Sequence, residues 1–199
     1  MQDTIKKPFT LPLGSKAPNF SLKGTDGKLH SLNDFKKAKG IVIFFTCNHC
    51  PYVKASDEVT RATADKYAKQ GIAFIGINSN SVNTVPEDSF EEMIHRHKEH
   101  HFPWLYLHDP TQEVAIAYGA LRTPHFYIFN NKNELVYTGR AVDSPRDSSK
   151  ITVNDLENAL EEFVKGKPIT TPLTNPIGCN VKWEGKDKKW IPGDACDLV

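Results

Sequence analysis

A continuous apolar stretch that runs almost directly into a pair of cysteines limits the folds open to this chain more than any other feature. Residues 40–45 (Gly-Ile-Val-Ile-Phe-Phe) are apolar without a break, which is typical of a central strand covered on both faces. Residues 47–51 (Cys-Asn-His-Cys-Pro) follow, and apolar residues then recur at roughly helical intervals until Gly71. A second apolar run, residues 72–77, predicts another buried strand. The pattern therefore predicts a parallel strand–helix–strand unit with a right-handed crossover.

The remaining patterns complete an α/β chain with a central mixed β-sheet flanked by helices. Apolar and polar residues alternate on both sides of Asp26-Gly27, which predicts an N-terminal β-hairpin because Asp-Gly favours a type I′ turn. A second hairpin is expected over residues 126–137. Residues 104–107 predict a short strand. Further helices are expected over residues 87–100, 111–118 and 153–164.

The length of 199 residues suits one domain with extensions. We expect an N-terminal extension over residues 1–13, a domain over residues 14–166 and a C-terminal extension over residues 167–199. No apolar run approaches the ~18 residues that span a bilayer, and the first residues lack the apolar core of a signal peptide. The sequence thus predicts a cytoplasmic protein, although removal of a signal sequence would leave the same pattern.

The charges of the chain give no indication of a nucleic-acid or membrane partner. Its 25 basic and 24 acidic side chains leave a formal charge of +1, so no extended field of one sign is expected. Four cysteines are too few for a disulfide scaffold of this length. Their spacing, with one close pair and two in the tail, favours a reactive pair instead.

The position of the close pair predicts redox chemistry. Cys47 comes where a buried strand ends and a helix is expected to begin, and the free N–H groups and dipole of a helix start stabilise a thiolate. Cys50 follows one helical turn later, near enough to close a small ring and expel a bound partner. We therefore predict that Cys47 attacks a disulfide and that Cys50 resolves the mixed disulfide. No cofactor is expected.

This motif, in its strand–helix context, resembles that of the thioredoxin superfamily. Residues 14–20 (Gly-Ser-Lys-Ala-Pro-Asn-Phe) resemble the G-x-x-A-P-x-F opening of peroxiredoxins of the alkyl hydroperoxide reductase/thiol-specific antioxidant type. Thr123 and Pro124 stand before a hairpin, as the cis-proline loop does in this superfamily. The resemblance implies a thioredoxin-like fold and a thiol–disulfide oxidoreductase. It implies protein or small-molecule disulfides as substrates, bound at Thr123 and Pro124, and a thiol reductant system as the partner.

The resemblance also implies roles for His49 and for the tail. In disulfide isomerases and periplasmic oxidases a histidine directly precedes the second cysteine, and His49 is accordingly expected to stabilise the Cys47 thiolate; the alternative is an exposed loop residue. Residues 176–183 are similar to the end of a peroxiredoxin-like subgroup, so Cys179 is expected near Cys47 as a possible resolving thiol. Alternatively, Cys179 and Cys196 form a structural disulfide or stay reduced.

Two other functions remain open. Peroxiredoxins carry P-x-x-x-T-x-x-C, and aligning Cys50 with their peroxidatic cysteine puts Cys47 at the threonine position and Ile43 at the proline position. A thiol peroxidase is therefore an alternative with weak expected turnover. The other is a non-catalytic module in which Cys47 and Cys50, with or without Cys179, hold zinc. No metal is predicted, and the histidine-rich residues 95–101 are expected to form a solvated helix face.

Overall fold

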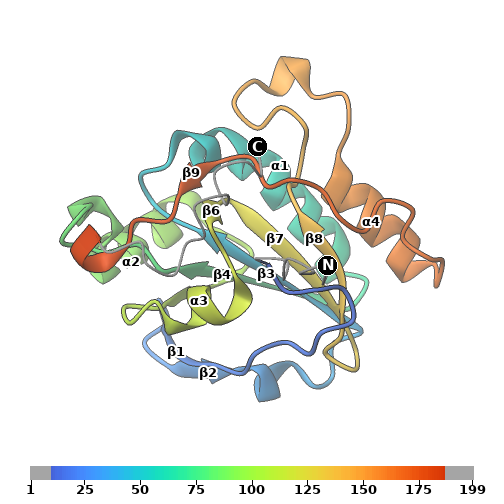
Figure 1. Ribbon diagram of the computed structural model, residues 1–199, viewed down its shortest axis with the longest axis horizontal. Coiled ribbons are helices and arrows are strands. Elements are labelled where there is room, and N and C mark those ends of the chain that lie inside the picture. Colours follow the sequence, from blue (N-terminus) through green and yellow to red (C-terminus); the bar gives the residue numbers. More distant parts are fainter. Residues whose placement is uncertain (1–9, 187–199) are drawn as a thin grey trace, which may run out of the picture.

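The structure is a computed structural model, and it describes residues 10–186. Within that range, seven strands form one mixed sheet in the order β2-β1-β5-β4-β3-β7-β8 (Figure 1). These strands are β1 (Ser21–Gly24), β2 (Leu29–Ser31), β3 (Gly40–Thr46), β4 (Ile72–Asn78), β5 (Leu105–His108), β7 (His125–Asn130) and β8 (Leu135–Gly139). The helices are α1 (Pro51–Ala68), α2 (Phe90–His100), α3 (Glu113–Tyr118) and α4 (Asp155–Val164). A separate short pair is formed by β6 (Arg122–Thr123) and β9 (Cys179–Asn180).

The centre of the sheet confirms the predicted strand–helix–strand unit. Strands β3 and β4 pair in parallel and are joined by α1, and β7 pairs antiparallel with the other side of β3. Every residue of β3 is buried. Val42 and Phe44 pack into the core cluster that contains side chains of α1, α2 and α4, whereas Ile41 and Ile43 pack into the cluster under α3. Each such side chain stabilises the fold by roughly 1.5–3 kcal/mol, so both layers of helices depend on this one strand.

The predicted helix over residues 87–100 begins later than expected. Residues of η2 (Pro86–Asp88) form a single 3₁₀ turn, and α2 starts at Phe90. Ser89 separates the two because its side chain caps α2, accepting a hydrogen bond from the backbone N–H of Glu92 at 3.3 Å. This break places Asp88 outside the helix, where its side chain turns inward and is buried.

The predicted hairpins are both present, and the tail folds back on the domain. Strand β9 pairs antiparallel with β6, and Figure 1 shows the two side by side near the start of α1. Val181 and Trp183 are buried in the core. The expectation that this tail segment lies near the cysteine motif is therefore confirmed. Cys196 lies outside the described residues. No helix among residues 10–186 is long and apolar enough to cross a bilayer.

Candidate active site

The helix that follows the cysteine motif starts three residues later than the sequence prediction required. Pro51 is the first residue of α1 and Cys50 is its N-cap. Proline favours the first helical position because it lacks the N–H that would be unpaired there and its φ is already helical. The Cys50 side chain thus lies at the N-terminal end of α1, and the backbone N–H of Val53, in the first turn, lowers the pKa of its thiol. Cys47, which was predicted to occupy this position, lies in the preceding loop.

Four donors surround the Cys50 sulfur. They are the thiol of Cys47, the thiol of Cys179, and the backbone N–H groups of Val53 and Cys179, and each favours the charged form of Cys50. The Cys47 thiol has the largest effect, and together these donors outweigh burial and lower the pKa of Cys50 to about 4. When protonated, the Cys50 thiol can instead donate to the carbonyl oxygen of Thr123 at 3.3 Å. The arrangement favours a Cys50 thiolate.

The surroundings of Cys47 have the opposite effect on its pKa. Its burial, its hydrogen bond to Cys50 and the negative charge of Asp88 all raise its pKa above the usual range, while a contact with the Thr123 hydroxyl at 3.5 Å lowers it slightly. Cys47 and Cys50 are 1% and 0% exposed. Both thiols are therefore buried, and the prediction that Cys47 is the more acidic of the two is wrong, because the helix start and the donors lie at Cys50.

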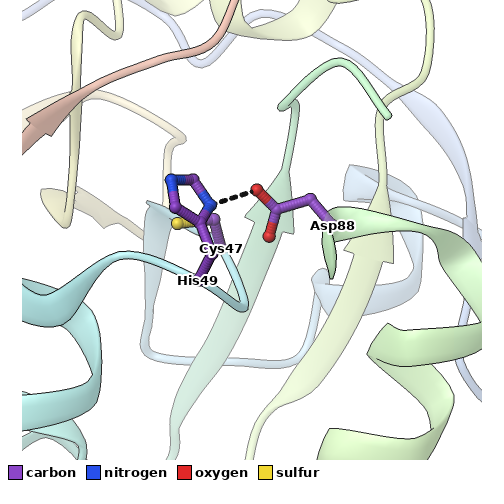
Figure 2. Close-up of side chains that lie close together, drawn as sticks. All are labelled: Cys47, His49 and Asp88. Carbon is purple, nitrogen blue, oxygen red and sulfur yellow. Dashed lines mark hydrogen bonds and ion pairs between the residues drawn. The ribbon is translucent and has the colours of Figure 1, made fainter. Parts of the chain in front are cut away.

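The buried carboxylate of Asp88, which was not predicted from the sequence, is hydrogen-bonded to the loop that carries the cysteines. Asp88 is fully buried and accepts hydrogen bonds from the backbone N–H of Asn48 at 2.6 Å, from Asn80 Nδ2 at 2.7 Å and from His49 Nδ1 at 2.5 Å (Figure 2). Burial raises the pKa of Asp88, but these three donors outweigh it and lower that pKa overall. The other side of Asn48 is fixed by Tyr106, whose hydroxyl donates to Asn48 Oδ1 at 2.9 Å.

His49 is turned toward this carboxylate rather than toward a thiolate. Its Nδ1 forms the ion-pair contact with Asp88, and its side chain is 21% exposed. Donor atoms of Cys47, His49 and Asp88 lie within 4.8 Å of one another (Figure 2). A thiolate, an imidazole and a carboxylate are all zinc ligands. This set shares only Cys47 with the predicted zinc ligands, and it uses a carboxylate that already accepts three hydrogen bonds.

The predicted substrate platform lies between the two cysteines. The Thr123-Pro124 peptide bond is cis, as predicted. The hydroxyl of Thr123 contacts Cys47 and its carbonyl oxygen contacts Cys50. The backbone here was expected to be free to pair with a substrate, but β9 occupies it, with Cys179 directly opposite Thr123. The tail of the chain thus stands where an extended peptide would pair.

The histidine-rich residues 95–101 lie on α2 and at its end. Arg96 is buried against Phe102 and forms an ion pair with Asp57. The Nδ1 atom of His97 is hydrogen-bonded to Thr25 at 2.5 Å. The other histidines of this segment are exposed.

A buried histidine, directly after the cis-proline, predicts a pH-dependent stability. His125 is 3% exposed, with hydrogen bonds to Thr138 at 3.0 Å and to Tyr127 at 3.1 Å, and burial lowers its pKa to about 3. In the unfolded chain its pKa is about 6.5. Between these values only the unfolded chain binds the proton, so acidification from pH 6.5 destabilises the fold by about 1.4 kcal/mol per pH unit.

Urea unfolding at pH 6.5 and pH 4.5 tests this prediction. The free energy of unfolding of the wild type should fall by about 2–3 kcal/mol more than that of His125→Gln between these two pH values. His95→Gln, which changes an exposed histidine of α2, should behave as the wild type. Equal losses in the wild type and His125→Gln would show that His125 is not held neutral.

The comparisons with known proteins agree with a redox site. A family model described as Redoxin matches residues 12–160. The chain is 28% identical over 106 residues to the chloroplastic peroxiredoxin Q of rice (Oryza sativa subsp. japonica). The aligned region covers 53% of this chain and 45% of that protein. The chain therefore spans less than half the length of this curated relative.

Of two similar solved structures, the first is a relative in sequence and the second shows the fold. An uncharacterized conserved protein from Geobacillus kaustophilus is 40% identical, with a TM-score of 0.83, over 90% of this chain and 95% of that one. The thioredoxin domain of a thiol-disulfide oxidoreductase from Bacteroides vulgatus is 20% identical, with a TM-score of 0.62, over 78% of this chain and 99% of that one. The second likeness shows that the fold is thioredoxin-like.

Proposed function

The chain belongs to the Redoxin family, and from that premise we propose that it is a thiol–disulfide oxidoreductase whose redox centre is the Cys47/Cys50 pair. The family and the thioredoxin-like fold support a thiol-based oxidoreductase. The observation that carries the finer proposal is the set of four hydrogen-bond donors around the Cys50 sulfur at the N-cap of α1. Such a sulfur is held as the nucleophilic thiolate at neutral pH.

The reaction begins at Cys50. Its thiolate attacks one sulfur of a substrate disulfide, the substrate S–S bond breaks and one substrate thiolate leaves. Cys47 then loses its proton and attacks the Cys50 sulfur, which releases the second substrate thiol and forms the Cys47–Cys50 disulfide. The protein has given two electrons to the substrate. His49 accepts the Cys47 proton in this proposal, because Asp88 orients the imidazole beside Cys47.

The substrate-binding role of Thr123 and Pro124 stays part of the proposal. The backbone of β6 can pair with an extended polypeptide disulfide once β9, which is paired with it at two residue positions, separates from it. A small disulfide needs less space at this site than an extended polypeptide does. A thiol reductant returns the electrons, and a cytoplasmic location, where thiols are kept reduced, suits that direction.

Two measurements test the proposed function. The ultraviolet absorbance of the thiolate should titrate near pH 4 in the reduced wild type, and this transition should disappear in Cys50→Ser. Equilibration with defined ratios of reduced to oxidised glutathione should give a Cys47–Cys50 disulfide with one two-electron transition. A protein in which neither cysteine ionises below pH 7 and no such disulfide forms would contradict the proposal.

A thiol peroxidase is the second candidate, because a relative of this chain is named a peroxiredoxin and Cys50 has the surroundings of a thiolate. The polar group that peroxiredoxins place at the threonine position is here the thiol of Cys47. Arg122 does not replace it, since its Nη1 donates to the carbonyl oxygen of Gly178 at 3.4 Å. Among residues 10–186, the threonine of the peroxiredoxin motif is thus replaced by Cys47, and Arg122 contacts the tail.

We therefore expect weak peroxide turnover. Loss of even one polarising donor costs about a hundredfold or more in rate, so hydrogen peroxide should oxidise the reduced protein at least ~100-fold more slowly than a small disulfide does. Stopped-flow measurement of peroxide consumption with a dithiol as reductant tests this. A fast, saturating burst would make the peroxidase the better description.

A zinc-binding module is the third candidate, favoured by the proximity of Cys47, His49 and Asp88. Elemental analysis of the purified protein separates it from the others. One equivalent of zinc that Asp88→Asn removes would support this role, whereas a metal-free protein that performs exchange would contradict it.

A further inference from the structure

The tail brings a third cysteine to the redox centre. Cys179 lies directly opposite Thr123 in the β6–β9 pairing. Its side chain packs against the cluster formed by Cys47, Cys50 and Val53, and its thiol and backbone N–H both lower the pKa of Cys50. Cys179 was predicted to lie near Cys47, but the thiol with which it interacts is that of Cys50.

The close approach of the tail depends on Gly178. A Cβ atom added at this residue would lie 2.1 Å from the carbonyl oxygen of Thr123, 2.6 Å from its carbonyl carbon and 3.0 Å from the nitrogen of Pro124. All three are backbone atoms, so no side-chain adjustment could make room for it. The backbone N–H of Val181 further fixes the strand by donating to Leu121 at 2.9 Å. The close backbone approach at Gly178 and the hydrogen bond of Val181 therefore hold Cys179 next to Cys50.

Exposure distinguishes the three sulfurs. Cys47 and Cys50 are buried, and only Cys179 is partly exposed. Cys179 is thus the residue of these three that is in contact with solvent while β9 remains in place. A disulfide that included Cys179 would connect the buried pair with the surface.

We propose that Cys179 is a third redox thiol, which exchanges with Cys50 and moves the disulfide from Cys47–Cys50 to Cys50–Cys179. This inference rests on the proposed oxidoreductase function. In the oxidised protein, the Cys179 thiol loses its proton to solvent and its thiolate attacks Cys50 Sγ. The Cys50–Cys179 bond forms, the Cys47–Cys50 bond breaks, and Cys47 leaves as a thiolate that takes up a proton. No net electrons are transferred in this step.

Reduction then takes place at the surface. One thiolate of an external dithiol attacks Cys179 Sγ, and Cys50 leaves as a thiolate. The second thiol of the dithiol loses its proton, attacks the mixed disulfide and expels Cys179, so the dithiol is oxidised and the protein gains two electrons. A leaving thiol of low pKa departs fastest, and the donors that lower the pKa of Cys50 to about 4 make it the best leaving group of the three. Burial raises the pKa of Cys179 to about 11, which makes its thiolate the stronger nucleophile once formed.

Peptide mapping after mild oxidation tests the proposal. The full chain with Cys196→Ser, to remove the remaining cysteine, is combined with either Cys47→Ser or Cys50→Ser. Each protein is oxidised with one equivalent of diamide, quenched with acid, alkylated and digested. We expect the Cys47→Ser protein to form an intramolecular Cys50–Cys179 bridge, at least about tenfold more abundant than any Cys47–Cys179 bridge in the Cys50→Ser protein.

A matched pair of tail variants tests the role of β9. Gly178→Ala, added to the Cys47→Ser protein, should reduce the rate of bridge formation by about tenfold or more, because the added Cβ displaces the strand from Thr123. Asn180→Ala removes an exposed side chain of the same strand and should leave the rate unchanged. Equal rates in the two variants would overturn the positioning role of β9.

The outcomes separate this proposal from the proposed function. If Cys179→Ser still forms the Cys47–Cys50 disulfide but Cys47→Ser yields only intermolecular dimers or adducts with Cys179 free, the third-thiol proposal is overturned and the oxidoreductase is retained. If Cys179→Ser forms no Cys47–Cys50 disulfide, the proposed function fails, whatever bridge Cys50 and Cys179 form in the wild type.

Discussion

Replacement of Cys50 by serine is expected to slow thiol–disulfide exchange by at least about a thousandfold, the scale on which enzymes lose activity with their nucleophile. Cys50 is the sulfur at the N-cap of α1, and its donors keep it ionised. A serine hydroxyl in the same position remains protonated at neutral pH and does not attack a sulfur. The rate is measured as the reduction of a small chromogenic disulfide by the reduced protein, first in a single turnover and then with excess dithiol.

The matched variant is Cys47→Ser, with Cys179→Ser added to both proteins so that no third thiol interferes. Cys50 should still attack in the Cys47→Ser protein, so one equivalent of chromophore is released in a burst. The mixed disulfide on Cys50 then persists because no resolving thiol is present. The opposite pattern, with a burst in the Cys50→Ser protein and none in the Cys47→Ser protein, would return the nucleophilic role to Cys47.

Much of the fold could be predicted from the sequence because its centre is coded by local periodicity. Residues 40–45 and 72–77 are apolar without interruption, and this is the pattern of strands covered on both faces. The start of α2 was predicted too early because the acidic residues before it suit a helix start equally well. The start at Phe90 is fixed by the hydrogen bond that the Ser89 side chain accepts from Glu92. The spacing of apolar residues carries no information about this bond.

The chemistry of the site was harder to predict because it depends on contacts between distant segments. Pro51 was a local signal for the helix start, and applying the preference of proline for the first helical position would have identified Cys50 as the capped sulfur. The other determinants were not local. Asp88 reaches the motif from 39 residues away at its bond with His49, and Cys179 arrives through the pairing of β9 with β6. No sequence pattern distinguished Asp88 from the acidic residues beside it.

Replacement of Asp88 by alanine should have the largest effect on stability of the changes considered for this chain. The Asp88 carboxylate is fully buried and accepts three hydrogen bonds. Its loss would leave the backbone N–H of Asn48 and the side-chain amide of Asn80 buried without their acceptor. Removing one partner of such a buried charged group costs about 3–5 kcal/mol. Urea denaturation at pH 7 should show this loss as a lower midpoint with an unchanged slope.

Glu87→Ala is the control for Asp88→Ala, because Glu87 is the adjacent acidic residue and its side chain is exposed. It should change the free energy of unfolding by no more than about 0.5 kcal/mol. Asp88→Asn keeps the volume but not the charge, and it should also lower the pKa of Cys47, which the Asp88 charge raises. The pKa of Asp88 itself is lowered by folding, so its stabilising contribution is present above the unfolded pKa of about 3.9 and is lost as the pH falls through the lower folded value. Unfolding midpoints that coincide for Asp88→Ala and Glu87→Ala would show that the buried carboxylate neither supports the fold nor fixes the loop that carries the cysteines.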